Sequence, residues 1–200
     1  IHMVQSEPYQ VERLDWEGRK AYVQQTNVDY YTDAIDYTKL KVLDEADGAP
    51  AGQGSAHHGE VHVLRRVSGY KKIRFHTHEN IGYGPVTLPD QELHTTACWW
   101  QLPQQVLDAC FDSRQDALDG FLSAAYALHL VAMVCVMAEG RDLQKAVGSG
   151  DGAWFATADQ SGRGMIRSGE SGEAMVEAAR GFTPTLFLYD NYPGGVGLSL

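Results

Sequence analysis

Residues 186–200, Leu-Phe-Leu-Tyr-Asp-Asn-Tyr-Pro-Gly-Gly-Val-Gly-Leu-Ser-Leu, are the stretch around which the rest of the 200-residue chain is organised. The apolar run at 186–189 is typical of a buried strand that is entered from a loop. Asp190 ends this run, and the Pro-Gly-Gly sequence at 193–195 predicts a turn in which glycine adopts positive φ. A second apolar segment begins after Gly197 and is short, so the chain looks cut there. Taken alone, the pattern predicts a C-terminal strand followed by a glycine turn.

Residues 188–197 also resemble a known family segment. They are similar to the F-x-Y-D-x-x-P-G-G-x-G segment of the MrfA-type zinc-binding (MZB) domain, the C-terminal region of a group of DEAD/DEAH-box superfamily 2 DNA helicases. The matching positions are Tyr189, Asp190, Pro193, Gly194, Gly195 and Gly197. Further stretches resemble the family in the expected order, so that the resemblance covers roughly residues 20–200. These stretches are residues 29–32, 67–73, 88–89, 92–96, 99–100 and 141–142.

The resemblance implies a non-catalytic accessory domain of an ATP-dependent DNA helicase, from a family linked to the repair of crosslinked DNA. Such a domain would hold or route DNA, or brace the motor domains, which would be its partners in cis. ATP and magnesium would bind to the motor, outside these residues. In the family a zinc-binding cysteine cluster follows the glycine segment, so zinc is expected beyond Leu200. No catalytic residue, metal ligand or cofactor is therefore expected within this fragment.

Composition limits the alternatives. The chain is 44% hydrophobic and 21% charged, which is typical of a globular domain, and its net charge of −10 argues against a surface that grips nucleic acid everywhere. Its three cysteines, Cys98, Cys110 and Cys135, form no C-x-x-C pair, which favours free thiols in a reducing compartment, and we expect the cytoplasm. The N-terminus has no signal peptide pattern, and residues 1–3 look like a cloning remnant.

The hydrophobic periodicity predicts an α+β fold in one domain. Residues 4–102 are expected to form an antiparallel sheet, either open or barrel-like, with strands at 21–31, 40–43 and 93–102. Residues 103–200 are expected to be mainly helical, with a final strand at 185–190. Smaller elements in this second half are a glycine-rich loop at 148–172 around a strand at 153–157, and a helix at 173–180.

A long helix is the main element expected in the second half. Pro103 suits the start of a first short helix, and Ser113 with Asp116 resembles a capping box that starts the long one. The long helix is expected to end at Glu139, before Gly140. Residues 120–138 carry no charge, which favours a buried core helix over a membrane span. Its deepest stripe is expected to be Leu118, Leu122, Tyr126, His129, Met133 and Val136, with His129 a hydrogen-bonded core histidine.

Residues 44–47 spell Asp-Glu-Ala-Asp, the helicase motif that binds magnesium and activates water for ATP hydrolysis. That role needs a phosphate-binding G-x-x-x-x-G-K-[ST] loop upstream, and residues 1–43 contain none. We interpret the match as coincidence, a strand that runs into an acidic turn and then a loop at 48–59.

Residues 61–78 hold five of the 16 lysines and arginines and no acidic residue. Ser68-Gly69 between two β-rich runs predicts a two-residue hairpin turn, which would place Leu64 opposite Ile73 and Arg65 opposite Lys72. Like charges directly opposed are unfavourable unless a negative group lies across them. That group is either a phosphate backbone, with an aromatic ring for base stacking, or an acidic surface of the protein itself. The candidate nucleic-acid-binding residues are Arg65, Arg66, Tyr70, Lys71, Lys72 and Arg74.

Two other ligand sites are alternatives to this interpretation. His76 and His78, placed on one strand, would present two imidazoles to a metal, but the neighbouring cations disfavour a divalent ion. Alternatively, Asp190 and the glycine turn would line a phosphate or metal pocket of a free-standing ligand-binding domain. A protein-interaction module would also suit the acidic composition. No nucleophile and base are spaced for catalysis, and we expect no membrane partner.

Overall fold

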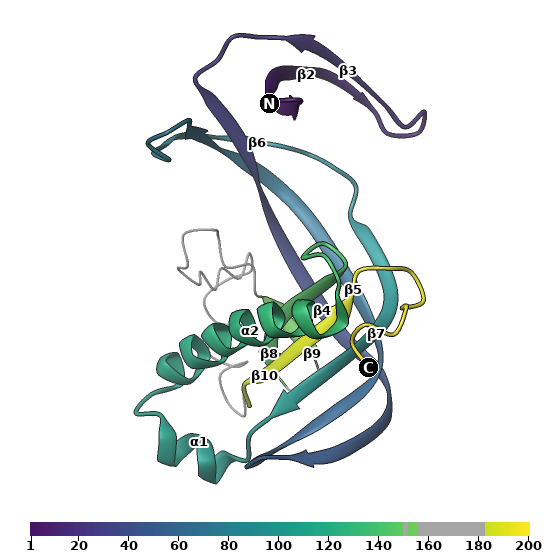
Figure 1. Ribbon diagram of the computed structural model, residues 1–200, viewed down its shortest axis with the longest axis vertical. Helices are drawn as coiled ribbons and strands as arrows, with labels where there is room; N and C mark the ends of the chain where they lie inside the picture. Colours follow the sequence, from purple (N-terminus) through teal and green to yellow (C-terminus); the bar gives the residue numbers. More distant parts are fainter. Residues whose placement is uncertain (150–151, 156–182) are drawn as a thin grey trace. The chain divides into compact units, whose positions relative to one another are not determined.

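The structure is a computed structural model that describes residues 1–149, 152–155 and 183–200 (Figure 1). Its contacts divide the chain into two compact units. Unit 1 comprises Ile1–Asp36 and Val67–Pro89, and unit 2 comprises Tyr37–Arg66 and Asp90–Leu200. Two long strands, β4 (Tyr30–Ala51) and β5 (Gly54–Arg74), contribute residues to both units. Unit 2 includes residues on both sides of position 102, at which the sequence pattern changes from strand to helix.

Unit 1 contains a three-stranded antiparallel sheet in the order β1-β2-β3, formed by β1 (His2–Val4), β2 (Glu7–Asp15) and β3 (Lys20–Gln25). It also contains β6 (Asn80–Pro85), which pairs antiparallel with the end of β5. Residues 1–3, which resemble a cloning remnant in the sequence, include two residues of β1. The terminal amino group of Ile1 donates to Thr32 Oγ1 at 2.7 Å, which ties this end to β4.

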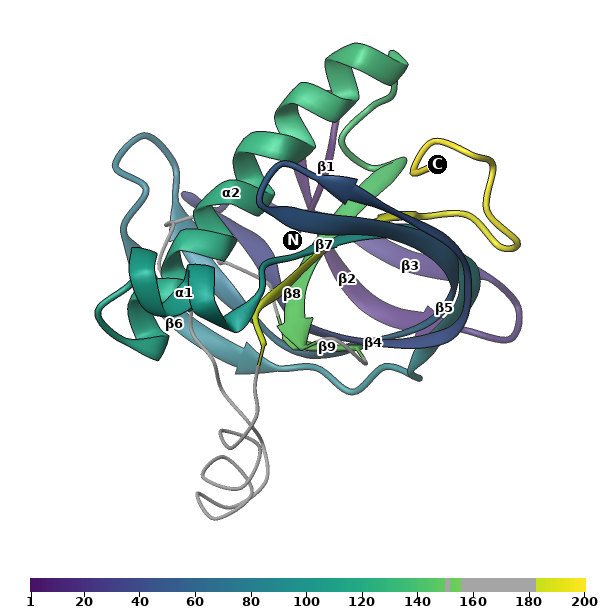
Figure 2. The ribbon, with the colours of Figure 1, turned by 90° about the horizontal axis from the view of Figure 1, so that it is seen from below.

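Unit 2 is built on antiparallel strands in the order β4-β9-β8-β10-β7-β5, with a further pairing between β4 and β5 (Figure 2). The later strands are β7 (Gln91–Gln101), β8 (Leu143–Ser149), β9 (Gly152–Phe155) and β10 (Thr185–Asp190). The predicted α+β class is confirmed in its broad form, and so is the predicted strand at 185–190. The described residues after position 102 are less helical than predicted, because they include β8 and β9 as well as β10. The barrel-like option for residues 4–102 is wrong. Strands β1, β2 and β3 form a sheet of their own, and β4 to β7 share their sheet with β8, β9 and β10, which lie outside residues 4–102.

Strand β10 is the centre of this sheet, and every one of its residues is buried. It pairs with β7 on one side, where Phe187 faces Trp99, and with β8 on the other, where Phe187 faces Ala146. Successive side chains point to opposite faces of a strand, so β10 contributes to two hydrophobic clusters. Phe187 and Tyr189 pack with Trp99 and Val61, whereas Leu186 and Leu188 pack with the helical layer, at Phe121 among others.

The helical layer consists of α1 (Gln104–Cys110) and α2 (Arg114–Val136). The predicted start of α2 is confirmed, because Ser113 Oγ accepts a hydrogen bond from the Asp116 amide at 3.1 Å. The predicted end is wrong by one turn, since Met137 adopts a left-handed conformation with φ of 53° and stops the helix before Gly140.

The prediction that α2 is a buried core helix is also wrong. By length and composition α2 is apolar enough to cross a membrane, yet only 17% of this span is buried. Its buried residues are Ala117, Phe121, Ala125 and His129. The predicted deepest stripe is therefore correct only at His129. Leu118, Leu122 and Tyr126 each follow a buried residue by one position, and Met133 and Val136 are only partly buried. The His129 ring donates from Nε2 to the Leu143 carbonyl at 2.7 Å, which confirms a hydrogen-bonded core histidine.

The predicted hairpin turn at Ser68-Gly69 is wrong, because β5 continues through both residues to Arg74. Leu64 lies opposite Glu92 of β7, not opposite Ile73. Gly69 is needed here for close strand approach, since a Cβ on Gly69 would lie 2.8 Å from the Gly84 carbonyl oxygen of β6.

The prediction of a loop at 48–59 is also wrong, because most of these residues lie in strands. β4 continues to Ala51 and β5 begins at Gly54, with Gly52 at φ of 64° in the tight connection. Gly59 lies inside β5, opposite Ala97 of β7. The predicted strand at 153–157 corresponds to β9, and the first two residues of the predicted glycine-rich loop, 148–149, belong to β8. Residues 150–151 and 156–172 of that loop and the predicted helix at 173–180 lie outside the described residues.

We expect Gly59→Ala to destabilise the protein by about 1–3 kcal/mol, the usual cost of forcing an extra carbon into a packed site. A Cβ there would overlap the Asp44 carbonyl oxygen of β4, which backbone pairing holds in place. Gly82→Ala is the matched control, because its Cβ would meet only the flexible Lys72 side chain at 3.9 Å. Urea unfolding measures both variants, and equal losses of stability would contradict the expected steric cause.

Candidate functional site

The resemblance-bearing residues gather around the Asp190 side chain at the end of β10, which is fully buried. Its carboxylate accepts hydrogen bonds from four successive backbone amides of the C-terminal loop. Oδ2 accepts from Val196 and Gly197 at 2.7 Å each and from Leu198 at 3.1 Å, and Oδ1 accepts from Ser199 at 2.8 Å. These four amides form a concave cradle of the kind that binds anions, and here the anion is the chain's own carboxylate.

The balance of burial and hydrogen bonding sets the charge of Asp190. Burial by itself would raise the pKa of the Asp190 carboxyl, because it penalises the charged form. The hydrogen bonds from residues 196–199 outweigh this penalty, and the pKa of Asp190 is lowered below its usual value. Asp190 is therefore an ionised carboxylate at neutral pH and the electrostatic anchor of the loop.

Glycine makes the loop geometry accessible. Gly194, Gly195 and Gly197 have φ of 80°, 71° and 84°, in the left-handed region that disfavours side chains. The Gly194 amide donates to the His94 carbonyl of β7 at 2.7 Å, which fixes the turn against the sheet. Gly195 also lies against Thr96, so closely that a Cβ would overlap the threonine Oγ1.

Two threonines of β7 complete the anchor on the sheet side. Thr95 Oγ1 donates to the Asp190 carbonyl oxygen at 2.8 Å, and Thr96 Oγ1 approaches Asp190 Oδ2 at 3.4 Å. Ser199 Oγ in turn donates to the Thr96 carbonyl at 3.1 Å. Residues 92–96 and 188–197, which are far apart in the sequence, thus meet at one place.

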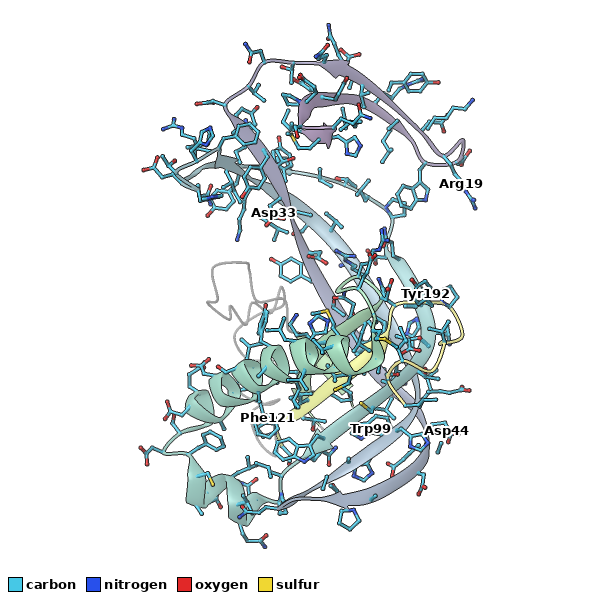
Figure 3. The ribbon with its side chains drawn as sticks, in the orientation of Figure 1. Arg19, Asp33, Asp44, Trp99, Phe121 and Tyr192 are labelled. Carbon is cyan, nitrogen blue, oxygen red and sulfur yellow. The ribbon has the colours of Figure 1, made fainter. Side chains whose placement is uncertain are left out.

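The connection between α2 and β8 holds the other side of the loop (Figure 3). Tyr192 donates its hydroxyl hydrogen to Asp142 Oδ1 at 2.5 Å, and Asn191 Nδ2 donates to the Arg141 carbonyl at 2.8 Å. The hydrogen bond from Tyr192, together with one from the Glu139 amide, lowers the pKa of Asp142, and the same Tyr192 contact raises the pKa of the phenol. Sequence reasoning missed this pair, although the family order of residues 141–142 and 188–197 was a signal that both belong to one structure.

This arrangement has a structural role. The amides that would cradle a phosphate already bind Asp190, so the alternative of a phosphate pocket lined by Asp190 and the glycine turn is not supported by the hydrogen bonding. Among the described residues there is no group of three or more histidine, cysteine or acidic side chains that is placed to hold a metal ion. All three cysteines, Cys98, Cys110 and Cys135, are free thiols.

The predicted nucleic-acid-binding residues all lie on β5 but do not form one hairpin. Arg65 and Arg66 belong to unit 2, whereas Tyr70, Lys71, Lys72 and Arg74 belong to unit 1. Arg66 makes two hydrogen bonds to Asp90, at 2.8 and 2.6 Å, which raise the pKa of the guanidinium. Arg65 faces Gln91 of β7 across the ladder, so the predicted opposition of Arg65 and Lys72 is wrong.

Within unit 1 the basic residues lie among aromatic and acidic neighbours. Lys72 Nζ lies 5.3 Å from the centre of the Tyr30 ring, and Lys72 faces Gly82 of β6. Arg74 is 3.4 Å from an oxygen of Asp29 and 3.5 Å from one of Glu79, with nearly half of its side chain exposed. Arg66 in unit 2 and Arg74 in unit 1 thus each have acidic neighbours within their own unit.

The remaining sequence candidates are dispersed. His76 and His78 have positive φ, 68° and 55°, and lie in the turn after β5, so the prediction that they share one strand face is wrong. The Asp-Glu-Ala-Asp stretch at 44–47 lies within β4, an antiparallel strand, and Glu45 contacts His57 Nδ1 at 2.8 Å. This contact agrees with our interpretation of the helicase-like match as coincidence.

The chain is homologous to one segment of a class of ATP-dependent helicases. It is 33% identical over 199 residues to the Uncharacterized ATP-dependent helicase YprA of Bacillus subtilis (strain 168), across 100% of this chain and 23% of the relative. A crystal structure of the DUF1998 helicase MrfA bound to DNA matches 99% of this chain with 31% identity and a TM-score of 0.54, and a further crystal structure of MrfA matches 100% with 27% identity and a TM-score of 0.53. No family model matches the chain.

The similarity to this helicase group that the sequence predicted is thereby confirmed. The chain spans less than a quarter of the relatives' length, 23% of YprA and 22% of each MrfA chain. The comparisons thus show similarity to one segment of these helicases.

We expect Asp190→Asn to lower the stability of unit 2 by about 2–3 kcal/mol, because hydrogen bonds to a charged group are stronger than those to a neutral amide. The lowered pKa of Asp190 also gives a pH dependence. Above the unfolded pKa near 3.8 the stabilisation is fully present, and it is lost as pH falls through the lower folded pKa, because the unfolded chain takes up the proton first. Urea unfolding between neutral pH and pH values below 3.8 measures this loss.

Asp112→Asn is the matched control, since it removes an exposed carboxylate of the same type. The acid-induced loss of stability should shrink in Asp190→Asn and persist in Asp112→Asn. An unaltered pH profile for Asp190→Asn would contradict the assignment of Asp190 as the ionised anchor.

We expect Gly195→Ala to be clearly more destabilising than Gly194→Ala. Both residues have positive φ, which costs a non-glycine residue about 1 kcal/mol. Only Gly195 would add a steric overlap with Thr96, whereas a Cβ on Gly194 meets nothing within 4 Å. Thermal unfolding of the two variants measures the difference. Equal melting temperatures would mean that the close packing of Gly195 on β7 contributes no specific stability.

Proposed function

We propose that this chain is a non-catalytic accessory domain of an ATP-dependent DNA helicase, contributing to DNA binding and routing or to bracing the motor. The observation that carries the proposal is the match along the whole chain to helicases, one of which was crystallised bound to DNA. The described residues support the non-catalytic part, because the most conspicuous motif, around Asp190, is used to hold the C-terminal loop.

The remaining parts of the proposal concern the parent protein. ATP and Mg²⁺ would bind to motor domains of a DEAD/DEAH-box type, which would be partners in cis, and zinc would bind to cysteines of an MZB domain beyond residue 200. The parent would act in DNA repair in the cytoplasm, where the three free thiols would stay reduced. DNA would be the partner that the whole helicase acts on.

Within unit 1 the best-placed candidates for DNA binding are the residues near the end of β5. Tyr70, Lys72 and Arg74 alternate along the strand and share one face, which combines an aromatic ring with two cations. Lys71 lies on the other face of the same strand. Arg66 is a weaker candidate, because both Asp90 oxygens already accept its hydrogen bonds.

The test uses the helicase-length protein and a Lys71→Ala/Lys72→Ala/Arg74→Ala variant. We expect weaker binding to single- and double-stranded DNA. On a duplex, the slope of log affinity against log salt concentration should be shallower by about 0.9 for each phosphate that the variant no longer neutralises. Fluorescence anisotropy at several salt concentrations measures both quantities, and DNA-stimulated ATP hydrolysis reports on the motor.

An Arg13→Ala/Arg19→Ala/Lys20→Ala variant is the control, because it removes the same charge from exposed positions on and between β2 and β3 of the same unit. Arg66→Ala should bind DNA almost as well as the unaltered protein. If the control and the test variants weaken binding equally, the effect is one of net charge and the β5 residues do not bind DNA. If the unaltered protein neither hydrolyses ATP nor binds DNA, the helicase role itself is wrong.

A further inference from the structure

Helix α2 has two apolar faces, of which the sheet covers only one. Ala117, Phe121, Ala125 and His129 recur at intervals of four and pack on unit 2. Rotating by 100° per residue places Ala127, Leu130, Val131 and Val134 on the opposite side of the helix. We call these four residues with Met137 the outer patch of α2. A surface helix normally carries polar residues on the side that faces water, and the second half of α2 does not.

The outer patch is strongly exposed in the described part of the chain. Leu130 and Val131 are 59% and 58% exposed, Val134 78% and Met137 93%. No charged residue occurs between Asp119 and Glu139, so nothing on the helix itself interrupts the patch. The outward positions of the first turns, by contrast, are polar, with Asp116, Asp119 and Ser123 exposed. Contiguous apolar surface of this kind on an otherwise charged domain marks an interaction site.

We propose that the outer patch of α2 docks against an apolar surface of a flanking domain in the same polypeptide, an inference that rests on the proposed helicase role. The reason is how little of each relative this chain covers. The match covers nearly all of this chain but only 22–23% of the relatives, so more than three quarters of each relative lies outside the matched segment and is available to cover this face. A patch made only of aliphatic and methionine side chains fits the apolar core of such an interdomain contact.

Charge argues against a lipid surface as the occupant. Helices that lie on membranes carry lysine and arginine beside their apolar face, which attract anionic lipids. The residues that bound the outer patch along the chain are Asp119 and Glu139, and the chain has a net charge of −10. The sheet side of α2 is also committed to the fold, through the His129 contact with the Leu143 carbonyl.

The chain supplies its own probe for this contact. Cys135 is exposed and follows Val134 directly, whereas Cys110 is exposed on α1, away from the patch. We expect thiol alkylation in the 200-residue chain to modify both at similar rates. In the helicase-length protein Cys135 should react at least about tenfold more slowly than Cys110, because a covered thiol is inaccessible. Mass spectrometry of peptides after timed alkylation measures the two rates in one sample.

A pair of variants separates docking from misfolding. Val134→Asp places a charge in the patch and should restore Cys135 alkylation in the helicase-length protein, whereas Ser123→Asp, an exposed polar position on the same helix, should leave Cys135 protected. Equal reactivity of Cys135 and Cys110 in the helicase-length protein overturns the inference. Three other results also overturn the inference. Cys135 is protected already in the 200-residue chain, or its protection rises with protein concentration, which indicates a second copy, or it is protected only when lipid vesicles are present.

The proposed function is tested independently of the docking inference. DNA-stimulated ATP hydrolysis, measured in the same preparation, tests the helicase role without reference to Cys135. Activity with a reactive Cys135 overturns only the docking inference. Protection of Cys135 in a preparation without DNA-stimulated ATP hydrolysis supports the interface and overturns the helicase role.

Discussion

The buried carboxylate of Asp190 is the constraint on which unit 2 depends. A lone buried negative charge is costly, and four consecutive backbone amides compensate it here. Those amides converge only because three glycines adopt left-handed conformations in the loop. The loop in turn is fixed to β7 through Thr95 and Thr96 and to the connection between α2 and β8 through Asp142. One ionised group therefore links the central strand, its neighbour β7 and the C-terminal loop.

The consequence for function is that a conspicuous motif need not be a ligand site. A glycine turn beside an aspartate looks like a phosphate or metal pocket when only the order of residues is known. In the structure the carboxylate and the amides that bind it belong to the same segment, so the motif stabilises the conformation of the C-terminal loop. The surfaces that we propose for partners lie elsewhere, on the aromatic and basic end of β5 and on the outer patch of α2.

The sequence predicted those features that depend on local chemistry. The apolar run before Asp190 predicted β10 with its correct bounds, and Ser113 predicted the start of α2. Prediction failed where a glycine is needed because a strand from another part of the chain packs closely against it. Gly59 and Gly69 were interpreted as loop and turn signals, but each allows another strand to approach closely, at Asp44 and at Gly84. The hydrogen-bond partners of Asp190 on β7 could also not be predicted from the sequence, because they are nearly a hundred positions away in the chain. The burial of α2 was predicted wrongly for a third reason, since uncharged composition does not show which face is covered.

The position of β10 has a consequence for biosynthesis. It is the central strand of unit 2, yet it is the last of the described strands in sequence order, and Thr185 pairs with both Gln101 and Gly148. Until β10 emerges from the ribosome, β7 and β8 present facing edges with unpaired amides and carbonyls. Contacts of such long sequence separation form slowly, so these two edges stay open to mispairing until β10 has been synthesised. The Asp190 loop then forms with the arriving strand and locks the inserted edge in place.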